Sequence, residues 1–243
     1  MATLFLIRHA VTAQTGRVLY GQTRGIGLDE RGRAQARGLV ERFASVRLTA
    51  IYSSPLERCV ETVEPLAAAK RLPITRVPDL IEMDTGSWTG RTLAQVRRTK
   101  PWTTVQRQPS AFSFPGGEGF VAAQARAVAA VETIARRHPR GRVAIATHGD
   151  IVRIVLAHLL GTPLDDFQRI VVDTASVSVV VTHRTSRRVV LVNDTGGLGR
   201  FGAHPAPPWE ASKDGAGRRC DCTCTIRFNL FDAFALPGIR FSG

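Results

Sequence analysis

The sequence predicts an α/β fold in which a mostly parallel sheet carries one antiparallel edge strand. Short β-rich runs alternate with helical patterns through residues 1–195, which is typical of parallel sheets covered by helices. The first apolar run, Leu4-Phe5-Leu6-Ile7, is short and bounded by polar residues, as buried strands are. The last two β-rich runs flank residues 183–188, which indicates a hairpin at one edge of the sheet.

Each expected strand is a short run of β-branched or apolar residues between turn residues. In chain order the strands are expected at 3–7, 50–53, 74–77, 142–147, 176–182 and 189–192. The first and fourth of these runs each end at a histidine, His9 and His148. Ligands of parallel sheets bind outside the carboxyl ends of the strands, so both histidines are expected at one rim.

The helices are expected where apolar residues recur with helical spacing. In chain order they are 29–44, 56–71, 92–99, 119–138 and 150–160. In the first helix Ala34, Leu39, Val40 and Phe43 are expected to share one face. The fourth is long and rich in Ala and Val, and it ends in cations before Pro139, where positive charge complements the helix dipole.

We expect one folded domain over residues 1–195 and a C-terminal tail over residues 196–243. Gly196-Gly197 and Ala206-Pro207-Pro208 are typical of linkers, and no clear periodicity follows until Ile226. This composition predicts that the tail is poorly ordered or loosely attached. A chain of 243 residues is long enough to bury a substantial core in its folded part.

Composition excludes several classes of protein. No stretch approaches the length of a membrane-spanning helix, so no membrane partner is expected. The first apolar run stops at Arg8, which is too early for a signal peptide, and a cytoplasmic location is expected. The formal charge of +13 comes from thirty Arg and three Lys spread along the chain. Without a basic run among them, nucleic acid is not an expected partner.

The four cysteines fit a reducing compartment rather than a disulfide scaffold. Cys59 stands alone, whereas Cys220, Cys222 and Cys224 alternate with other residues in the tail. Alternating cysteines lack the spacing of zinc ligands, so no metal site is predicted.

Four segments carry residues suited to phosphate chemistry. Each of these residues has an ordinary structural explanation when taken singly, such as a solvated arginine or a loop carboxylate. Together, two arginines and two histidines at one rim form an anion pocket, and a nearby carboxylate can move protons. The residues are Arg8, His9, Arg58, Glu82 and His148.

In these segments the chain resembles the histidine phosphatase superfamily, in its phosphoglycerate-mutase-like branch. Within that branch it resembles a group of actinobacterial proteins described as probable phosphomutases. The family motifs occur in the family's order at residues 8–10, 28–36, 53–62, 82–90, 115–118 and 148–149. The resemblance implies a three-layer α/β/α sandwich.

The resemblance and the chemistry assign the same roles to these residues. His9 is the expected nucleophile, with one ring nitrogen free and the other held by a backbone carbonyl. Glu82 is expected to protonate the leaving alcohol and then to deprotonate the attacking water. Arg8 and Arg58 would bind phosphoryl oxygens through their planar guanidinium groups. His148 would stabilise the transition state.

The backbone at Gly149 is expected to open a helix whose N–H groups add affinity for anions. No metal and no cofactor are implied. The segment after His9 departs from the family pattern, since Ala10 replaces a glycine and disfavours positive φ. Gln22 is the expected substitute for an amide donor to phosphate. Glu118 is expected to be structural, with Arg126 as its partner.

Phosphatases and phosphomutases of this kind share the phosphohistidine and differ in which molecule receives the phosphoryl group. A mutase must exclude water and hold a second phosphate with additional cations. The family's cofactor-dependent mutases have an Arg/Tyr-rich stretch and a long insertion between Glu82 and Pro115, which this chain lacks. The sequence therefore favours a phosphomonoesterase acting on a small phosphorylated metabolite.

Two alternatives stay open, a phosphoglycerate-type phosphomutase and a non-catalytic regulatory or anion-binding protein. The substrate is not readable, because specificity in such enzymes comes from the lid segment 85–117. Its Trp88, Trp102 and Phe112 can belong to the core or to the pocket wall, and its cations are expected to form a solvated helix face. The oligomeric state is also open, with a homodimer as one option.

Overall fold

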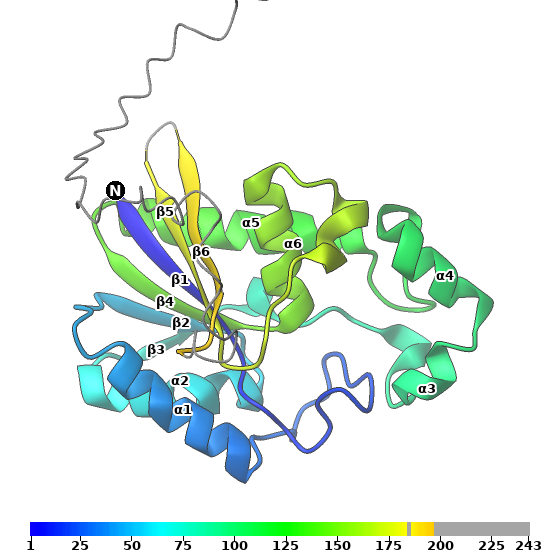
Figure 1. Ribbon diagram of the computed structural model, residues 1–243, viewed down its shortest axis with the longest axis horizontal. Coiled ribbons are helices and arrows are strands. Elements are labelled where there is room, and N and C mark those ends of the chain that lie inside the picture. Colours follow the sequence, from blue (N-terminus) through cyan, green and yellow to red (C-terminus); the bar gives the residue numbers. More distant parts are fainter. Residues whose placement is uncertain (184–185, 197–243) are drawn as a thin grey trace, which may run out of the picture. The chain divides into compact units, whose positions relative to one another are not determined.

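The structure is a computed structural model that describes residues 1–183 and 186–196. The expected tail, from residue 197 onward, and its three cysteines lie outside these ranges. The described residues form one sheet of six strands in the order β3-β2-β4-β1-β5-β6 (Figure 1). The strands are β1 (Ala2–Arg8), β2 (Ala50–Ser53), β3 (Ile74–Arg76), β4 (Arg142–Thr147), β5 (Val177–Thr182) and β6 (Arg187–Asp194).

The expected fold class is confirmed. β1, β2, β3 and β4 pair in parallel, and β5 pairs antiparallel with both β1 and β6. The hairpin expected around residues 183–188 therefore joins the last two strands. The strand that runs against the others is β5, one place inside the edge, and β6 forms the edge itself.

All five expected helices are present, and the structure adds one that the sequence pattern did not predict. The segment expected as one helix over 92–99 ends early, and a separate helix follows with Pro101 in its first turn, where proline is tolerated. The helices are α1 (Glu30–Arg42), α2 (Glu57–Lys70), α3 (Leu93–Val96), α4 (Lys100–Arg107), α5 (Phe120–Arg137) and α6 (Gly149–Leu160).

Two helical layers cover the sheet (Figure 1). On one face α1 and α2 pack apolar side chains such as Leu39 and Leu66 against Ile7 and Ile51. On the other face α5 and α6 pack against the alternate strand residues, including Leu6 and Ile145. The central strands are thus buried on both faces. This explains why their sequences are continuous apolar runs rather than alternating ones.

Helix α1 begins at an Asp29 cap whose carboxylate accepts a hydrogen bond from the Gly32 N–H at 2.8 Å. Its buried face contains Ala36, Leu39 and the adjoining Phe43, which recur at helical spacing. The expectation that Ala34 lies on this face is wrong. Ala34 is exposed, because a helix that turns Leu39 and Phe43 inward brings Ala36 beside them instead.

An aromatic cluster fills the space beside the carboxyl ends of the strands. Trp88, Phe112, Phe114 and Phe120 are all buried, with ring centroids of neighbouring pairs 5.1–6.4 Å apart. Trp88 and Phe112 therefore belong to the core, and Trp102, which stacks on Trp88, is only half-buried. The cluster holds the 85–120 segment against the sheet.

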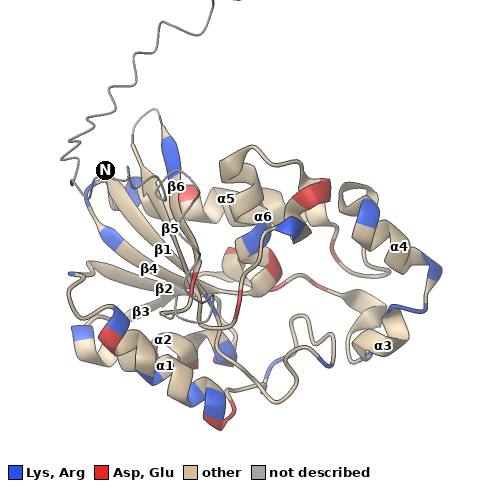
Figure 2. Ribbon diagram, viewed as in Figure 1, with Lys and Arg blue, Asp and Glu red and all other residues tan. Residues whose placement is uncertain are grey.

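Basic residues are spread over several elements. Figure 2 shows Lys and Arg on α1, on α4 and on β6, and acidic residues on α1 as well. Among the helices in the described ranges, none is long and apolar enough to cross a membrane.

Gly32 and Gly38 provide a matched pair for testing the packing of α1. A Cβ atom at Gly32 would lie 2.0 Å from the Val11 carbonyl oxygen, whereas one at Gly38 would meet nothing within 4 Å. Gly32→Ala is expected to lower the free energy of unfolding by about 1–3 kcal/mol through overpacking. Gly38→Ala is expected to raise it by about 0.5–1 kcal/mol because alanine favours helix. Urea denaturation of both variants measures this, and equal effects would contradict the close approach.

Candidate active site

The parallel strands β1, β4 and β2 deliver functional residues to one edge of the sheet. Arg8 ends β1 and His9 follows it, while His148 follows the end of β4. The hydrogen-bond ladder continues past the strands, because the His9 N–H donates to the Thr147 carbonyl at 2.8 Å. On the other side of β4, the Ser54 N–H donates to the Ala146 carbonyl at 2.8 Å. The strand ends are therefore locked together at the level of the site.

His9 has the arrangement expected of a nucleophile. Its Nδ1 lies 2.8 Å from the Ala10 carbonyl oxygen. A carbonyl only accepts hydrogen bonds, so Nδ1 carries the ring proton and Nε2 keeps its lone pair. Burial, and then the positive charge of Arg58, lower the pKa of His9 to about 3. The ring is therefore neutral at physiological pH.

Ala10 is compatible with this arrangement, although it stands where the family motif has glycine. Its φ is not positive, and its N–H donates to the Thr62 hydroxyl at 2.9 Å. Its methyl group is fully buried in a small cluster with Leu28, Ala36 and Ala175. The added Cβ therefore packs rather than strains the backbone.

Two arginines lie beside His9, of which Arg58 is fully buried and Arg8 is half-buried. Arg8 donates from Nη1 to the Val172 carbonyl at 2.7 Å, and Arg58 donates from Nη2 to the Gly21 carbonyl at 2.7 Å. Within the described ranges, the Nε atoms of both side chains have no hydrogen-bond partner. Buried donors of this kind suit an anion, which would satisfy them.

Gly149 permits the path of Arg8. A Cβ at position 149 would lie 3.0 Å from the Arg8 Nε, so a side chain there would crowd the guanidinium group. Gly149 is also the first residue of α6, whose N–H groups and dipole face the same edge.

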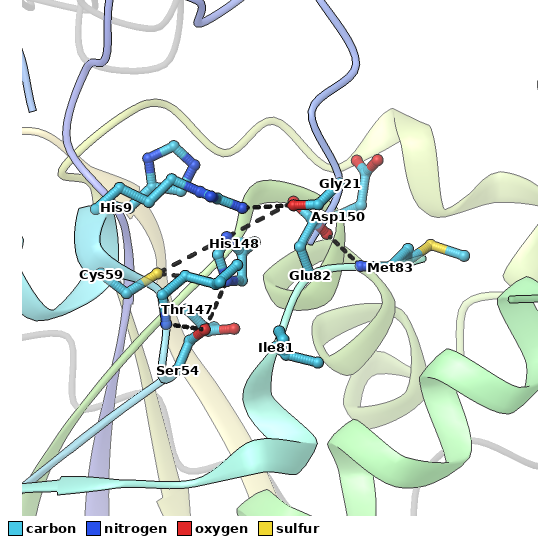
Figure 3. Close-up of polar contacts among 12 residues, drawn as sticks. His9, Gly21, Ser54, Cys59, Ile81, Glu82, Met83, Thr147, His148 and Asp150 are labelled. Carbon is cyan, nitrogen blue, oxygen red and sulfur yellow. Dashed lines mark hydrogen bonds and ion pairs between the residues drawn. The ribbon is translucent and has the colours of Figure 1, made fainter. Parts of the chain in front are cut away.

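Glu82 brings a carboxyl group to the same place from the segment that follows the short 3-10 helix Pro78–Leu80. Its Oε1 accepts a hydrogen bond from the Met83 N–H at 3.0 Å, and its Oε2 lies 3.8 Å from the His148 Nδ1 (Figure 3). Burial, and then the negative charge of Asp150, raise the pKa of Glu82 to about 7. A carboxyl with this pKa can both give and take a proton near neutral pH.

His148 is fully buried, and its ring lies 5.4 Å from that of His9. Its Nε2 lies 2.8 Å from the Ser54 hydroxyl oxygen, as Figure 3 shows. Burial, and then the charge of Arg58, hold the pKa of His148 well below its usual value. Like His9, it is neutral at physiological pH.

The five core residues expected from the sequence thus meet around a cavity of about 280 Å³. Arg8, His9 and Glu82 line it, and the fully buried Arg58 and His148 lie next to these residues. Much of the remaining wall is apolar and comes from the 16–21 loop, from α3 to α5 and from the 3-10 helix Leu164–Arg169. Its apolar members are Val18, Leu19, Met83, Leu93, Trp102, Val105, Phe114, Phe120 and Phe167.

Gln22, which is expected from the sequence to donate to phosphate, makes a different contact in the structure. Its amide nitrogen donates to the Glu82 carbonyl at 2.9 Å, and it is not among the described residues that line the cavity. In this position the side chain supports the segment that carries the acid.

Three neighbours of the site were not singled out from the sequence. The Tyr20 ring stacks on the Arg58 guanidinium at 4.7 Å, and no motif marks it. Asp150 and Arg153 form an ion pair of 3.0 Å and both line the cavity. An acidic and a basic residue three apart, directly after a strand-end histidine, are a signal that could have identified this pair.

The expected pairing of Glu118 with Arg126 is confirmed, at 2.7 Å. Arg126 also donates to the carbonyls of Asp79, Ile81 and Glu82. It therefore ties α5 to the backbone that positions the acid, and Glu118 is structural in this geometry. In the part of the chain that the structure describes, no three His, Cys, Asp or Glu residues are grouped as metal ligands are.

Comparison with known proteins agrees with this geometry. The sequence profile of the histidine phosphatase superfamily (branch 1) matches residues 4–195. The chain is 32% identical over 205 residues to phosphoserine phosphatase 1 of Hydrogenobacter thermophilus, covering 83% of this chain and 96% of that protein. It is 29% identical over 184 residues to a probable phosphoglycerate mutase, GpmB, of Proteus mirabilis, covering 74% of this chain and 85% of that protein.

A solved structure, that of Bacillus stearothermophilus YhfR, resembles the fold described above. The two share 31% identity and a TM-score of 0.74, over 79% of this chain and 96% of that one.

Arg126 can be tested against an exposed arginine of the same helix. Arg126→Ala leaves the partly buried Glu118 carboxylate and the carbonyls of Asp79 and Ile81 without this donor, so it is expected to lower the free energy of unfolding by about 1–3 kcal/mol. Arg136→Ala, at a side chain 68% exposed, is expected to change it by less than about 0.5 kcal/mol. Chemical denaturation compares the two, and a harmless Arg126→Ala would refute the anchoring role.

Proposed function

The chain belongs to the histidine phosphatase superfamily (branch 1) and is a phosphoric monoester hydrolase, and we propose that it works through a phosphohistidine at His9, without a metal. The family resemblance expected from the motifs is confirmed. The observation that carries the proposed mechanism is the His9 ring, whose Nδ1 faces a carbonyl and whose Nε2 is unprotonated beside two arginines.

In the first half-reaction the His9 Nε2 attacks phosphorus in line with the ester oxygen. The N–P bond forms, the P–O bond to the alcohol breaks, and the Glu82 carboxyl gives its proton to the leaving oxygen. Arg8 and Arg58 stay charged throughout and balance the phosphoryl oxygens. His148 adds a hydrogen bond to the oxygens in the transition state.

In the second half-reaction Glu82, now a carboxylate, takes a proton from water as the water oxygen attacks phosphorus. The N–P bond breaks, inorganic phosphate leaves, and the His9 Nε2 regains its lone pair. Glu82 ends protonated, ready for the next substrate. Its pKa of about 7 suits both directions of proton transfer.

The substrate we propose is a small phosphorylated carboxylic acid of the phosphoserine or phosphoglycerate type. The relative named phosphoserine phosphatase 1 supports this class. So does Arg153, which lines the cavity and whose buried Nε has no hydrogen-bond partner within the described ranges. A guanidinium group beyond the phosphate site suits a carboxylate.

The mutase alternative is supported by the relative named probable phosphoglycerate mutase. A mutase needs cations around a second phosphate, and the 91–107 segment contains three cations close together in sequence. Arg97, Arg98 and Lys100 are exposed, and the cavity residues from this segment are instead Leu93, Trp102, Val105 and Gln106. This geometry favours hydrolysis over transfer to a second substrate.

Phosphate release from a panel of esters in EDTA tests the activity. O-phosphoserine and 3-phosphoglycerate are expected to be hydrolysed, with an acid-labile phosphohistidine trapped on rapid denaturation. His9→Ala should lose at least about 10³-fold in kcat. His158→Ala, at an exposed histidine of α6, should stay within about two-fold of the native enzyme. Isomerisation of 3-phosphoglycerate with bisphosphoglycerate that outpaces phosphate release would establish the mutase instead.

The pH dependence of kcat/KM tests Glu82. The acid is protonated below its pKa of about 7, so the rate is expected to fall as pH rises through 7. On the acid side the rate should fall only near pH 3, where the His9 Nε2 takes a proton. Glu82→Gln should lose about 10²–10⁴-fold together with the alkaline limb. For p-nitrophenyl phosphate, whose leaving group needs no proton, the loss should be smaller. An alkaline limb that persists in Glu82→Gln would assign that titration to another group.

A further inference from the structure

The two nitrogens of the His148 ring lie in different surroundings. Nδ1 lies 3.8 Å from the Oε2 of Glu82, a residue that lines the cavity. Nε2 lies 2.8 Å from the Ser54 hydroxyl oxygen (Figure 3). The Cys59 sulfur lies nearer to Nε2, at 3.4 Å, than to Nδ1, at 3.7 Å. All three of His148, Ser54 and Cys59 are fully buried, so these contacts are made without competing solvent.

The Ser54 hydroxyl can donate its proton to the ring. Its oxygen already accepts a hydrogen bond from the Leu56 N–H, at 3.4 Å. The hydroxyl proton is then free to turn toward the nearest acceptor, which is the His148 Nε2.

Cys59 presents a second neutral donor to the ring, nearer to Nε2 than to Nδ1. Burial raises the pKa of its thiol well above the usual value, so it stays an S–H group rather than a thiolate. A thiol is a weak donor, and the 3.4 Å distance between sulfur and Nε2 is within hydrogen-bond range for sulfur.

A neutral imidazole has one N–H and one lone pair, so the partner of one nitrogen decides the state of the other. We infer that Ser54, assisted by Cys59, is a positioning residue that holds His148 in the tautomer with its proton on Nδ1. The ring then offers an N–H donor toward the cavity. In the opposite tautomer a lone pair would face the phosphoryl oxygens and repel them.

The effect of Ser54 on catalysis rests on the proposed function. The tautomer of His148 does not depend on it. The tautomer is a property of the resting protein and is measured by nitrogen NMR of the chain labelled with ¹⁵N-histidine, with His148→Asn used to assign the signals. We expect the native protein to carry the His148 proton on Nδ1. A proton on Nε2 would overturn the inference, whether or not the protein is an active phosphatase.

Ser54→Ala, Ser54→Thr and Cys59→Ala test the kinetic consequence. Ser54→Ala is expected to shift His148 toward a mixture of tautomers and to lower kcat about 10- to 100-fold, which is less than the loss expected for an oxyanion donor removed outright. KM should change by less than about two-fold, because Arg8 and Arg58 still bind the substrate. Ser54→Thr keeps the hydroxyl and should restore kcat. Cys59→Ala should lower kcat less than Ser54→Ala does. The double variant Ser54→Ala/Cys59→Ala should lower kcat more than either single substitution.

Ser53→Ala is the matched control. Ser53 is the neighbour of Ser54 and equally buried, but its hydroxyl donates to the Ser54 carbonyl at 2.8 Å. Ser53→Ala should therefore leave the His148 tautomer and kcat unchanged. Equal losses in Ser53→Ala and Ser54→Ala would assign the effect to general packing and overturn the positioning role, as would a Ser54→Ala variant with native kcat and tautomer. A native protein without any phosphatase activity would instead refute the proposed function.

Discussion

The parallel pairing of β1 with β4 is the constraint on which the rest of the site depends. Its register places Arg8 opposite Thr147, so the chain leaves both strands at the same level of the sheet. The next residue on each strand is a histidine, and the two rings lie 5.4 Å apart. Because neighbouring strands lie only about 4.8 Å apart, both side chains can reach one phosphoryl group. A shift of one residue in either strand would turn one histidine to the opposite face.

Burial determines how charge is distributed over this site. An imidazolium ring would be desolvated beside the Arg58 guanidinium, so both histidines stay neutral. Positive charge is therefore carried by arginines, which remain protonated at any physiological pH. This division lets the site attract a phosphoryl dianion while the nucleophile keeps its lone pair. A site that relied on protonated histidines to bind the anion would lose its nucleophile.

The sequence predicts those parts of the molecule that leave a local pattern. Strand and helix periodicity predict β1, β4 and α6, and the ordered motifs predict that the five core residues lie close together, as they do in the structure. The contact between Ser54 and His148 joins residues 94 apart and leaves no periodic trace, so it is visible only in three dimensions. The same holds for Tyr20 on Arg58. Gln22 is expected to donate to phosphate because of its position in the sequence, but its amide donates to the Glu82 carbonyl instead. Sequence position alone does not determine the acceptor of a side-chain amide.

Glu82 is held by other elements than the phosphate-binding groups and the variable wall of the cavity. The residues that carry out the reaction are therefore separate from those that select the substrate. Glu82 lies on a segment held by the Gln22 amide and by Arg126 of α5. The first residue of the same helix, Phe120, packs in the aromatic cluster that backs the cavity wall. Side chains of α3 and α4 can therefore vary, and reshape the space for the alcohol, while α5 keeps Glu82 at its place. In the proposed mechanism the phosphoryl group meets strand ends and the first turns of α2 and α6, which such changes do not touch.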